Sequence, residues 1–362
     1  MHLKTKINYQ KLFVIVGMYM TLGALITVYD HFLVLSVLDN MYPSEYSLIR
    51  KLLFNVLAGL MGGTLGGIFL IFYFHRKFGN KPYGLGIIAV MISFIVIVSF
   101  ITVSLGIIFV PLQSGKALSD PQGKAAFYSY IQDPLHIKNI IVWSGIVALT
   151  QFFLQLNDKF GQGLLWAFMR GKYHKSREEN RIFMFLDLRS STTIAEQIGH
   201  NNYYNLLKDF YADITDAIIY NLGQIYQYVG DEVVVSWTMK EGIANNKCLK
   251  CYFEMRKAIA DKKEIYLNKY GLVPEFKAGL HYGIVTVGEI GVIKKDIAYS
   301  GDVLNTAARI QGQCNQHKVN LLVSSDLLEL LDHQLLYKII PIGEIHLRGK
   351  EIPVSLNTIK IA

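Results

Sequence analysis

The chain has 362 residues, of which 52% are hydrophobic and only 18% are charged. A globular protein is about one quarter charged, so the composition excludes a chain that is soluble throughout. The missing charge is almost wholly before residue 157, which predicts a membrane part followed by a soluble part. The net charge of +8 comes without a basic face interleaved with aromatic residues, so we expect no nucleic-acid partner.

The first half of the chain contains four apolar stretches without charge. Each is close to the roughly 17–25 residues that an α-helix needs to cross a bilayer. We therefore predict an α-helical four-span membrane domain over residues 1–156, in contact with a lipid bilayer. The four stretches are Leu12–Tyr29, Leu52–Phe74, Tyr83–Val110 and Asn139–Leu156.

Charge in the connecting segments predicts the orientation of these spans. Lys and Arg favour the cytoplasmic side of a membrane. They gather in alternate connections, which fits four spans with both ends inside: a multi-pass protein of the cell (inner) membrane whose N-terminus and soluble part are cytoplasmic. These basic residues are Lys4, Lys6 and Lys11; Arg76, Lys77 and Lys81; and Lys159, Arg170, Lys172, Lys175 and Arg177.

The second span carries Gly59, Gly63 and Gly67, four residues apart and therefore on one helical face. Small residues at this spacing allow two helix backbones to approach closely. The partner helix is either in a second copy of the chain or among the other three spans, and the sequence leaves both open. No charged residue lies inside a span, so we expect an anchor, a dimerisation unit or a sensor rather than an ion pathway.

Residues 157–180 connect the two parts. Leu164, Leu165, Phe168 and Met169 fall on one helical face and basic residues follow. This pattern predicts a juxtamembrane linker helix, which lies at the headgroup boundary or pairs with its copy in a dimer.

From Arg181 onward, helical and strand patterns alternate. This order suits one α+β domain over residues 181–362, with an antiparallel sheet and helices on one side. Cys248, Cys251 and Cys314 fall in this part, where we expect packed thiols rather than disulfides or a metal site. We predict strands at 182–188, 224–229, 232–237, 276–282 and 284–287, helices at 202–222, 247–269 and 303–317, and short strands to 359.

Two carboxylates stand at strand ends in apolar sequence. Asp187 follows the buried strand of IFMFLDL, and Asp231 lies at the hairpin turn of YQYVGDEVVVSW. A charge beside a dry strand is costly unless it is neutralised. Mg²⁺ prefers oxygen ligands and is often held by one or two carboxylates plus substrate phosphates. The alternatives are that Asp187 caps a helix and that Asp231 is only a turn residue.

The neighbouring sequence favours phosphate chemistry. Hydroxyl residues follow Asp187 at a predicted helix start, where backbone N–H groups bind anions. Asn305 and Arg309 lie four residues apart on one helical face, an arrangement suited to charge on a transferring phosphoryl group. Arg348 and Lys350 lie together in the tight turn of HLRGKE.

Five ordered motifs over roughly residues 181–360 resemble the catalytic domain of class III nucleotidyl cyclases, in a membrane-bound bacterial form. The resemblance implies a ferredoxin-like antiparallel sheet with helices. It also implies an adenylate cyclase, a phosphorus–oxygen lyase that converts ATP to 3′,5′-cyclic AMP and pyrophosphate. The motifs are FLDLRSSTTIAE, YQYVGDEVVVSW, AGLHYGIVTVGEIG, GDVLNTAARI and LRGKEIPV.

The resemblance also implies residue roles. Asp187 and Asp231 match the two metal-binding aspartates, which hold two Mg²⁺ (or Mn²⁺) per site while the ribose 3′-hydroxyl attacks the α-phosphate in line. The loop whose backbone holds the phosphates matches Leu188, Ser190, Ser191 and Thr192.

The remaining roles fall in the second half of the domain. Asn305 matches the asparagine that orients the ribose, and Arg309 matches the arginine on the transition-state phosphate. Lys350 matches the lysine on the terminal phosphates, with Arg348 as the alternative. In the family, the aspartates of one chain work with the asparagine and arginine of another, which implies a head-to-tail homodimer with active sites at the subunit interface.

Base selection departs from the family's patterns. Gln227 and Ala298 occupy the positions that read the base, and they match neither the adenylate nor the guanylate pattern. Because Gln227 can both donate and accept hydrogen bonds, guanylate or pyrimidine nucleotide cyclisation stays an alternative to ATP. A catalytically silent nucleotide-sensing module is a further alternative.

Overall fold

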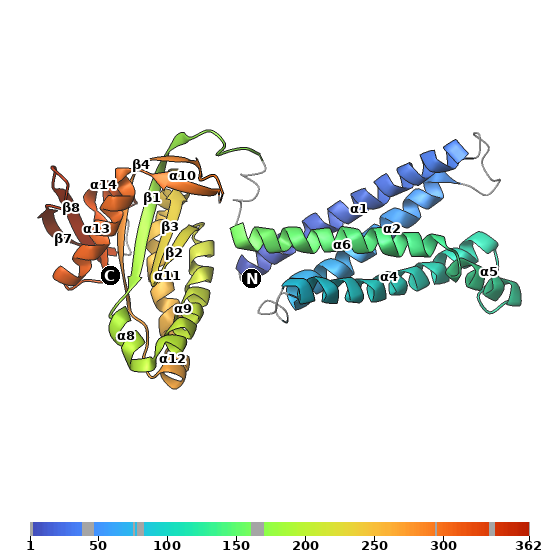
Figure 1. Ribbon diagram of the computed structural model, residues 1–362, viewed down its shortest axis with the longest axis horizontal. Helices are drawn as coiled ribbons and strands as arrows, with labels where there is room; N and C mark the ends of the chain where they lie inside the picture. The colour runs from blue at the N-terminus through green and yellow to red at the C-terminus, as the bar shows by residue number, and fades with distance from the viewer. Residues whose placement is uncertain are drawn as a thin grey trace. The chain divides into compact units, whose positions relative to one another are not determined.

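The computed structural model describes residues 3–37, 47–74, 77, 83–160, 170–293, 295–332 and 337–361. The chain divides into two compact units, Met1–Lys159 and Phe160–Ala362. Figure 1 shows the first as long helices and the second as a sheet with helices.

The first unit confirms the four long apolar helices. Segments within them, Asn8–Ser36, Leu48–Phe74, Gly84–Ser114 and His136–Asn157, are long and apolar enough to cross a membrane. The helices are α1 (Leu3–Val37), α2 (Leu48–Ile68) with its π-helical continuation η1 (Phe69–Phe74), α4 (Tyr83–Ser114) and α6 (Leu135–Phe160).

One further helix, α5 (Pro121–Ile131), was not predicted from the sequence. It lies between α4 and α6 in the chain and packs on α4 (Figure 1). Asp120 caps its N-terminus by accepting a hydrogen bond from the Gln122 N–H, and Pro121 occupies the first helical position, where its missing N–H is harmless. These two local signals were available in the sequence.

The glycine face of α2 packs against α1. A Cβ on Gly59 would lie 2.5 Å from the carbonyl oxygen of Tyr19, and one on Gly63 would lie 2.8 Å from the Cα of Val16. Side chains larger than hydrogen would therefore force the two helices apart. The structure decides between the two readings of this stripe: it is used for packing within the chain.

The second unit contains one mixed sheet in the order β2-β3-β1-β4-β6-β8-β7, with β5 paired to β4. The α+β class is confirmed, but β4 and β6 run parallel rather than antiparallel, because a helix connects them as a crossover. The strands are β1 (Arg177–Leu188), β2 (Gln224–Val229), β3 (Glu232–Thr238), β4 (Phe276–Ile290), β5 (Asp296–Ser300), β6 (Leu321–Ser324), β7 (Tyr337–Ile345) and β8 (Val354–Ile361).

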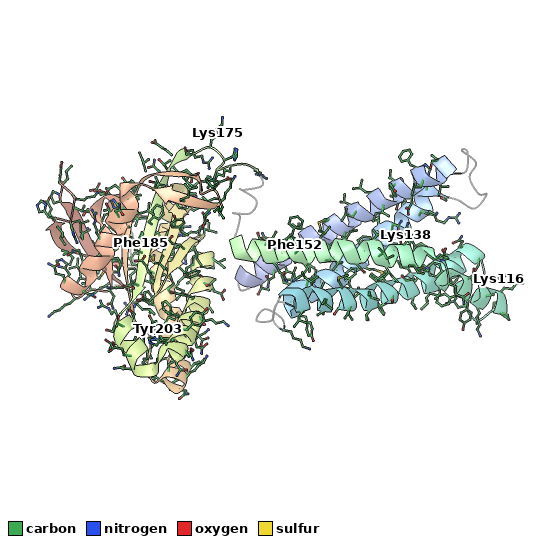
Figure 2. All side chains as sticks on the ribbon, in the orientation of Figure 1. Lys116, Lys138, Phe152, Lys175, Phe185 and Tyr203 are labelled. Atoms are coloured by element: carbon green, nitrogen blue, oxygen red, sulfur yellow. The ribbon has the colours of Figure 1, made fainter. Side chains whose placement is uncertain are left out.

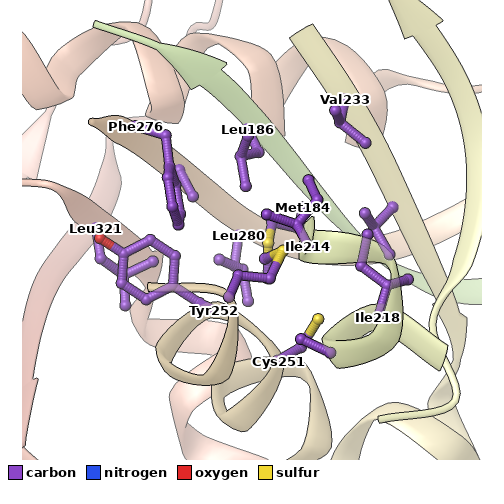
Figure 3. Packing of buried hydrophobic residues seen from close by; sticks show 14 of the residues in the cluster. Met184, Leu186, Ile214, Ile218, Val233, Cys251, Tyr252, Phe276, Leu280 and Leu321 are labelled. Atoms are coloured by element: carbon purple, nitrogen blue, oxygen red, sulfur yellow. The ribbon is translucent and has the colours of Figure 1, made fainter. Parts of the chain in front are cut away.

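Helices cover both faces of this sheet, so the prediction of helices on one side is wrong. Alternate residues of β1 point to opposite faces: Met184 and Leu186 join the core under α9 and α11 (Figure 3), whereas Phe183 and Phe185 pack with α13. The longer helices are α8 (Ser191–Ile198), α9 (His200–Tyr220), α11 (Lys247–Asp261), α12 (Lys263–Tyr270) and α13 (Asp302–Gln316); the short ones are α10 (Met239–Ile243), η2 (Ala244–Asn246) and α14 (Ser325–Glu329).

Two elements are divided differently from the sequence prediction. The helix predicted over 247–269 is broken at Lys262, which has φ −104° and ψ 12°. The two strands predicted around Gly283 are one continuous strand, β4. Gly283 instead gives room to Val303, whose Cβ would lie 3.2 Å from a Cβ at this position.

The linker differs more. Its predicted apolar face, Leu164, Leu165, Phe168 and Met169, lies outside the described residues. Residues 170–176 form turns and 177–180 are the beginning of β1, so this part is not helical. The buried Tyr173 explains why: its ring packs with Val287 and Ile297, and its carbonyl oxygen accepts a hydrogen bond from the Glu289 N–H at 3.1 Å. Tertiary contact with β4 and β5 therefore fixes this segment.

Candidate active site

Asp187 lies at the end of the central strand β1. In the sheet register it stands opposite Glu232 of β3 and Lys277 of β4. The next residue, Leu188, is buried and completes the strand. The Asp187 carboxylate therefore lies near the end of a central strand, with charged residues on both neighbouring strands.

Asp231 reaches the same place from the β2–β3 hairpin. Val229 pairs with Glu232, so Gly230 and Asp231 form a two-residue loop, and Gly230 has the positive φ (62°) that such a loop needs. The hydroxyl of Tyr211, on α9, donates a hydrogen bond of 2.7 Å to the Gly230 carbonyl oxygen and anchors the loop. Tyr211 was not identified from the sequence.

The two aspartates converge, as the sequence predicted. Burial and then the neighbouring Asp231, which is within hydrogen-bonding reach, raise the pKa of Asp187. Burial and the charges of both aspartates likewise raise the pKa of Glu232. Tyr203 of α9 (Figure 2) responds in the same way, since burial and the Asp231 charge raise its pKa. The site is therefore rich in negative charge that favours a cation.

Two donors that the sequence analysis missed contact Asp187. The Lys277 Nζ lies 3.3 Å from its Oδ2, and the Gln311 Nε2 donates a hydrogen bond of 3.1 Å to the same oxygen. The Lys277 side chain is 12% exposed and Gln311 is 6% exposed. Lys277 follows from strand pairing, but Gln311 is 124 residues from Asp187, and no local pattern connects them.

The donor set fits Mg²⁺ better than a soft metal. Among the described residues, no three or more His, Cys, Asp and Glu side chains are placed so that they could hold one metal ion together. Two facing carboxylates suffice for Mg²⁺, which keeps waters and takes further oxygens from substrate phosphates. Asp187 and Asp231 are therefore the residues that would hold the metal ions.

The predicted phosphate-binding loop comes directly after β1 in the chain. Ser190 adopts a left-handed conformation (φ 54°) and precedes α8, without a hydrogen bond from its side chain to the helix N-terminus. Arg189 anchors this turn: its guanidinium donates to the side chains of Asn320 (2.8 Å) and Asn315 (3.1 Å) and to the Val319 carbonyl oxygen (2.7 Å). The first amides of α8, near Ser191 and Thr192, are thus held on a fixed backbone, where they favour an anion.

A second group of predicted residues gathers where α13 begins. The Lys350 Nζ lies 2.7 Å from the Asp302 Oδ2, and this ion pair lowers the pKa of Asp302. Arg309 lies beside the turn of residues 347–350, where a Cβ on Gly349 would be 3.6 Å from its guanidinium. Asn305 and Arg348 are exposed. Lys350, rather than Arg348, is thus the residue of this turn that points to α13.

The two groups use different sides of α13. Gln311 faces the sheet and Asp187, and residues two positions apart on a helix do not face the same way, so Arg309 points elsewhere. Asn305 lies six residues before Gln311, about 9 Å along the helix axis. One chain therefore brings together Asp187 with Asp231, and separately Arg309 with Lys350, but does not join the two groups.

The predicted base-reading residues lie on two strands that are tied together. Gln227 is exposed beside a β-bulge in β2, and Ala298 on β5 is partly buried. Their neighbours meet: the Tyr299 N–H donates a hydrogen bond of 3.3 Å to the Tyr226 hydroxyl. The guanidinium of the buried Arg181 lies 4.9 Å from the centre of the Tyr299 ring. The hydrogen bond between Tyr299 and Tyr226 is the contact that joins the two strands.

The cysteines lie outside this site. Cys248, Cys251 and Cys314 are buried thiols, which confirms their expected packing role. Cys251 is part of the core between the sheet and α11 (Figure 3).

Comparison with known proteins gives a consistent result. Residues 173–359 match the family described as the adenylate and guanylate cyclase catalytic domain. "Adenylate cyclase 2" from Rhizobium meliloti (strain 1021) is 33% identical over 199 residues, which are 55% of this chain and 55% of that protein. "Adenylate cyclase" from Anabaena cylindrica is 26% identical over 185 residues, which are 49% of this chain and 36% of that protein. The chain thus spans about half or less of these relatives' lengths.

Solved structures share the fold. A bacterial light-regulated adenylyl cyclase superposes with a TM-score of 0.52 at 18% identity, covering 63% of this chain and 66% of that one. A second structure of such a protein gives 0.51 at 20% identity, covering 60% and 64%. At these identities the likeness shows the fold alone.

Proposed function

The chain belongs to the family of adenylate and guanylate cyclase catalytic domains, and we propose that it is a membrane-bound adenylate cyclase that converts ATP to 3′,5′-cyclic AMP and pyrophosphate. The observation that carries this proposal is that Asp187 and Asp231 lie close together at the end of the central strand β1. The two carboxylates come from distant segments, Asp231 disfavours the charged form of Asp187, and the charge of the site is balanced when a cation binds. The names of the relatives favour ATP as substrate.

Asp187 and Asp231 would hold up to two Mg²⁺ or Mn²⁺ ions. When bound, such ions lower the pKa of a ribose 3′-hydroxyl and neutralise a leaving pyrophosphate. The fixed turn of Ser190 and the amides of Ser191 and Thr192 bind the phosphates. Because Mg²⁺ takes several ligands from water and substrate, the two-carboxylate site is complete only with nucleotide.

The second group of residues completes the chemistry. Asn305 orients the ribose, and the Arg309 guanidinium stabilises charge that develops on the α-phosphate. Lys350 binds the terminal phosphates, for which it exchanges its ion pair with Asp302 for one with substrate. Most of the rate enhancement then comes from positioning and electrostatics.

A symmetric homodimer supplies both groups to each site. Within one chain, Asn305 and Arg309 face away from Asp187, so a second copy must present them. A head-to-tail pair related by a two-fold axis builds two such sites at once. The helices of the first unit anchor the pair in the inner membrane, with the N-terminus and the catalytic unit in the cytoplasm.

Gln227 and Ala298 favour one alternative, a guanylate or pyrimidine nucleotide cyclase with the same mechanism. Ala298 offers no side-chain hydrogen bond, so Gln227 carries base recognition and accommodates more than one base. A catalytically silent module has no comparable support, since the acidic pair, Asn305, Arg309 and Lys350 are all present.

The test is product identification. Full-length protein in detergent is given each of the four NTPs with Mg²⁺ or Mn²⁺, and the cyclic product is identified by mass. We expect cyclic AMP from ATP, and loss of product by at least about 100-fold in Asp187→Ala and Asp231→Ala. Asp216→Ala, which removes an exposed carboxylate of α9, is the matched control and should retain activity. Absence of any cyclic product from the unmodified chain would overturn the proposal.

A further inference from the structure

Both protein donors to Asp187 bind the same oxygen. Gln311 Nε2 lies 3.1 Å and Lys277 Nζ 3.3 Å from Oδ2. A carboxylate held through one oxygen by two donors from separate elements cannot rotate freely. Its other oxygen, Oδ1, is the one available to a cation shared with Asp231.

The two donors differ in character. Gln311 is neutral, almost wholly buried and fixed on α13, so it contributes direction without charge. Lys277, on β4, is the second residue that contacts Asp187. It brings a positive charge into a site that otherwise holds Asp187, Asp231 and Glu232. The ammonium offsets part of the repulsion among the three carboxylates in the metal-free protein. The same charge opposes the arrival of a divalent cation.

We propose that Gln311 is a positioning residue that fixes the Asp187 carboxylate for metal binding, and that Lys277 is a resident counter-charge that stabilises the metal-free site. This inference rests on the proposed function only in taking a divalent cation as the ligand. Residues that orient metal ligands change metal affinity by about 10–100-fold when they are replaced. The two residues should therefore respond to replacement in opposite ways.

Helix α13 gives Gln311 a second significance. Gln311 serves the metal site of its own chain, whereas Asn305 and Arg309 on the same helix serve the partner's site. A single helix thus contacts both sites of the proposed dimer, and Gln311 belongs functionally with Asp187 although it is only two residues from Arg309 in sequence.

The test measures Mn²⁺ binding to the full-length protein in detergent by electron paramagnetic resonance, together with the thermal unfolding midpoint with and without Mn²⁺. Gln311→Met keeps the size of the side chain but removes the donor, and should weaken Mn²⁺ binding about 10–100-fold. Lys277→Met should lower the midpoint of the metal-free protein and increase the stabilisation that Mn²⁺ provides. Gln316→Met, at an exposed position of the same helix, should match the unmodified chain in both measurements.

Mixing experiments supply a second readout. Gln311→Met chains should regain an intact site when mixed with Asn305→Ala chains, but not when mixed with Asp187→Ala chains. Unchanged Mn²⁺ affinity in Gln311→Met, or an equal loss in Gln316→Met, would overturn the positioning role even if the protein makes cyclic nucleotide. Unaltered stability of metal-free Lys277→Met would overturn the counter-charge role. An unmodified chain that neither binds Mn²⁺ nor yields product would instead remove the proposed function itself.

Discussion

At Asp187, burial and the neighbouring Asp231 act in the same direction and raise the pKa of the carboxyl group, whereas Lys277 lowers it. The balance leaves a carboxylate that is unfavourable without a cation. Strand pairing explains the closeness of Lys277, because Asp187 and Lys277 face each other in the β1–β4 register. The electrostatic character of the site thus follows from which strands pair.

His281 shows the opposite effect of burial. It lies opposite Phe183 in the register, and its Nδ1 is 2.8 Å from the Ser324 hydroxyl oxygen. Burial, followed by the charge of Lys350, lowers its pKa from 6.5 to about 4. The imidazole is therefore neutral at physiological pH, which suits a packing role rather than acid–base chemistry.

This shift predicts acid sensitivity. The unfolded chain binds a proton at His281 near pH 6.5, whereas the folded chain does so only near pH 4. Above about pH 6.5 His281 is neutral in both states and does not affect the free energy of unfolding. As the pH falls from about 6.5 toward 4, the unfolded chain gains the proton first, so the free energy of unfolding decreases. His281→Gln should reduce the slope of unfolding free energy against pH in this window by at most about 1.4 kcal/mol per pH unit. Denaturant unfolding of the full chain at several pH values measures the slope.

The control for this experiment is His200→Gln, at an exposed position, which should leave the slope unchanged. Parallel pH profiles for the unmodified chain and His281→Gln would contradict the assignment of the acid sensitivity to this residue.

At the scale of elements, α1 and α2 pack through glycine. Gly59 and Gly63 of α2 face the backbone of α1 at Tyr19 and Val16. A second close approach lies at Gly23 of α1, where a Cβ would be 2.5 Å from the carbonyl oxygen of Asn55. Contacts of this kind depend on backbone proximity, because apolar side chains gain little from leaving lipid for another apolar surface.

Gly63→Leu should therefore destabilise the first unit by about 1–3 kcal/mol, the usual cost of overpacking. Unfolding in mixed micelles of increasing SDS content measures the loss. Gly17→Leu introduces the same side chain at a position of α1 where nothing lies within 4 Å of the added Cβ, and should be tolerated. Equal stability of the two variants would show that the stripe does not hold α1 to α2.

Helix α13 is the element that organises the candidate site. Its apolar residues Val303 and Ala307 pack with Phe183 and Phe185 on the face of the sheet away from α9. Since its sheet-facing side also carries Gln311, Asn305 and Arg309 must face elsewhere. The prediction that all helices lie on one side of the sheet failed at this element, and the same placement divides the predicted residues into two groups.

At the scale of the whole molecule, this division is the reason why we propose that a second chain completes each site. Asp187 and Asp231 lie in one group, and Arg309 and Lys350 in the other, with Asn305 at the start of the helix. Neither group alone binds both ends of a nucleoside triphosphate. We therefore expect the isolated chain to be inactive and the dimer to be the catalytic unit.

Complementation tests this expectation. Asp187→Ala and Asn305→Ala chains should each be inactive as homodimers, whereas a mixed dimer keeps one complete site. Random pairing places half of the chains in mixed dimers with one of two sites intact, so the mixture should recover about a quarter of the unmodified activity. Cyclic nucleotide formation after co-expression of the two tagged chains measures it. No recovery, with mixed dimers shown by tag capture, would contradict the shared site.

The sequence by itself determined the four apolar helices, the α+β class, the Gly230–Asp231 hairpin and the position of Asp187 at the end of a buried strand. Each of these depends on local signals: uninterrupted hydrophobic length, the alternation of strand residues, turn chemistry, or a carboxylate that follows a buried strand. The ordered motifs add the family to these local signals. Such features can be predicted correctly because neighbouring residues in the chain determine them.

Only the tertiary structure decided the rest. The partner of the glycine stripe, the docking of Tyr173 on the β4–β5 hairpin and the contact of Gln311 with Asp187 all join residues far apart in the chain. The type of these residues does not predict which residue they contact, because a neutral amide or a glycine suits many surroundings. Which surface each one meets is set by the packing of whole elements, so the contacts of Asp187 with Gln311 and Lys277, and the separation of Asp187 from Arg309 and Lys350 within one chain, became visible only in three dimensions.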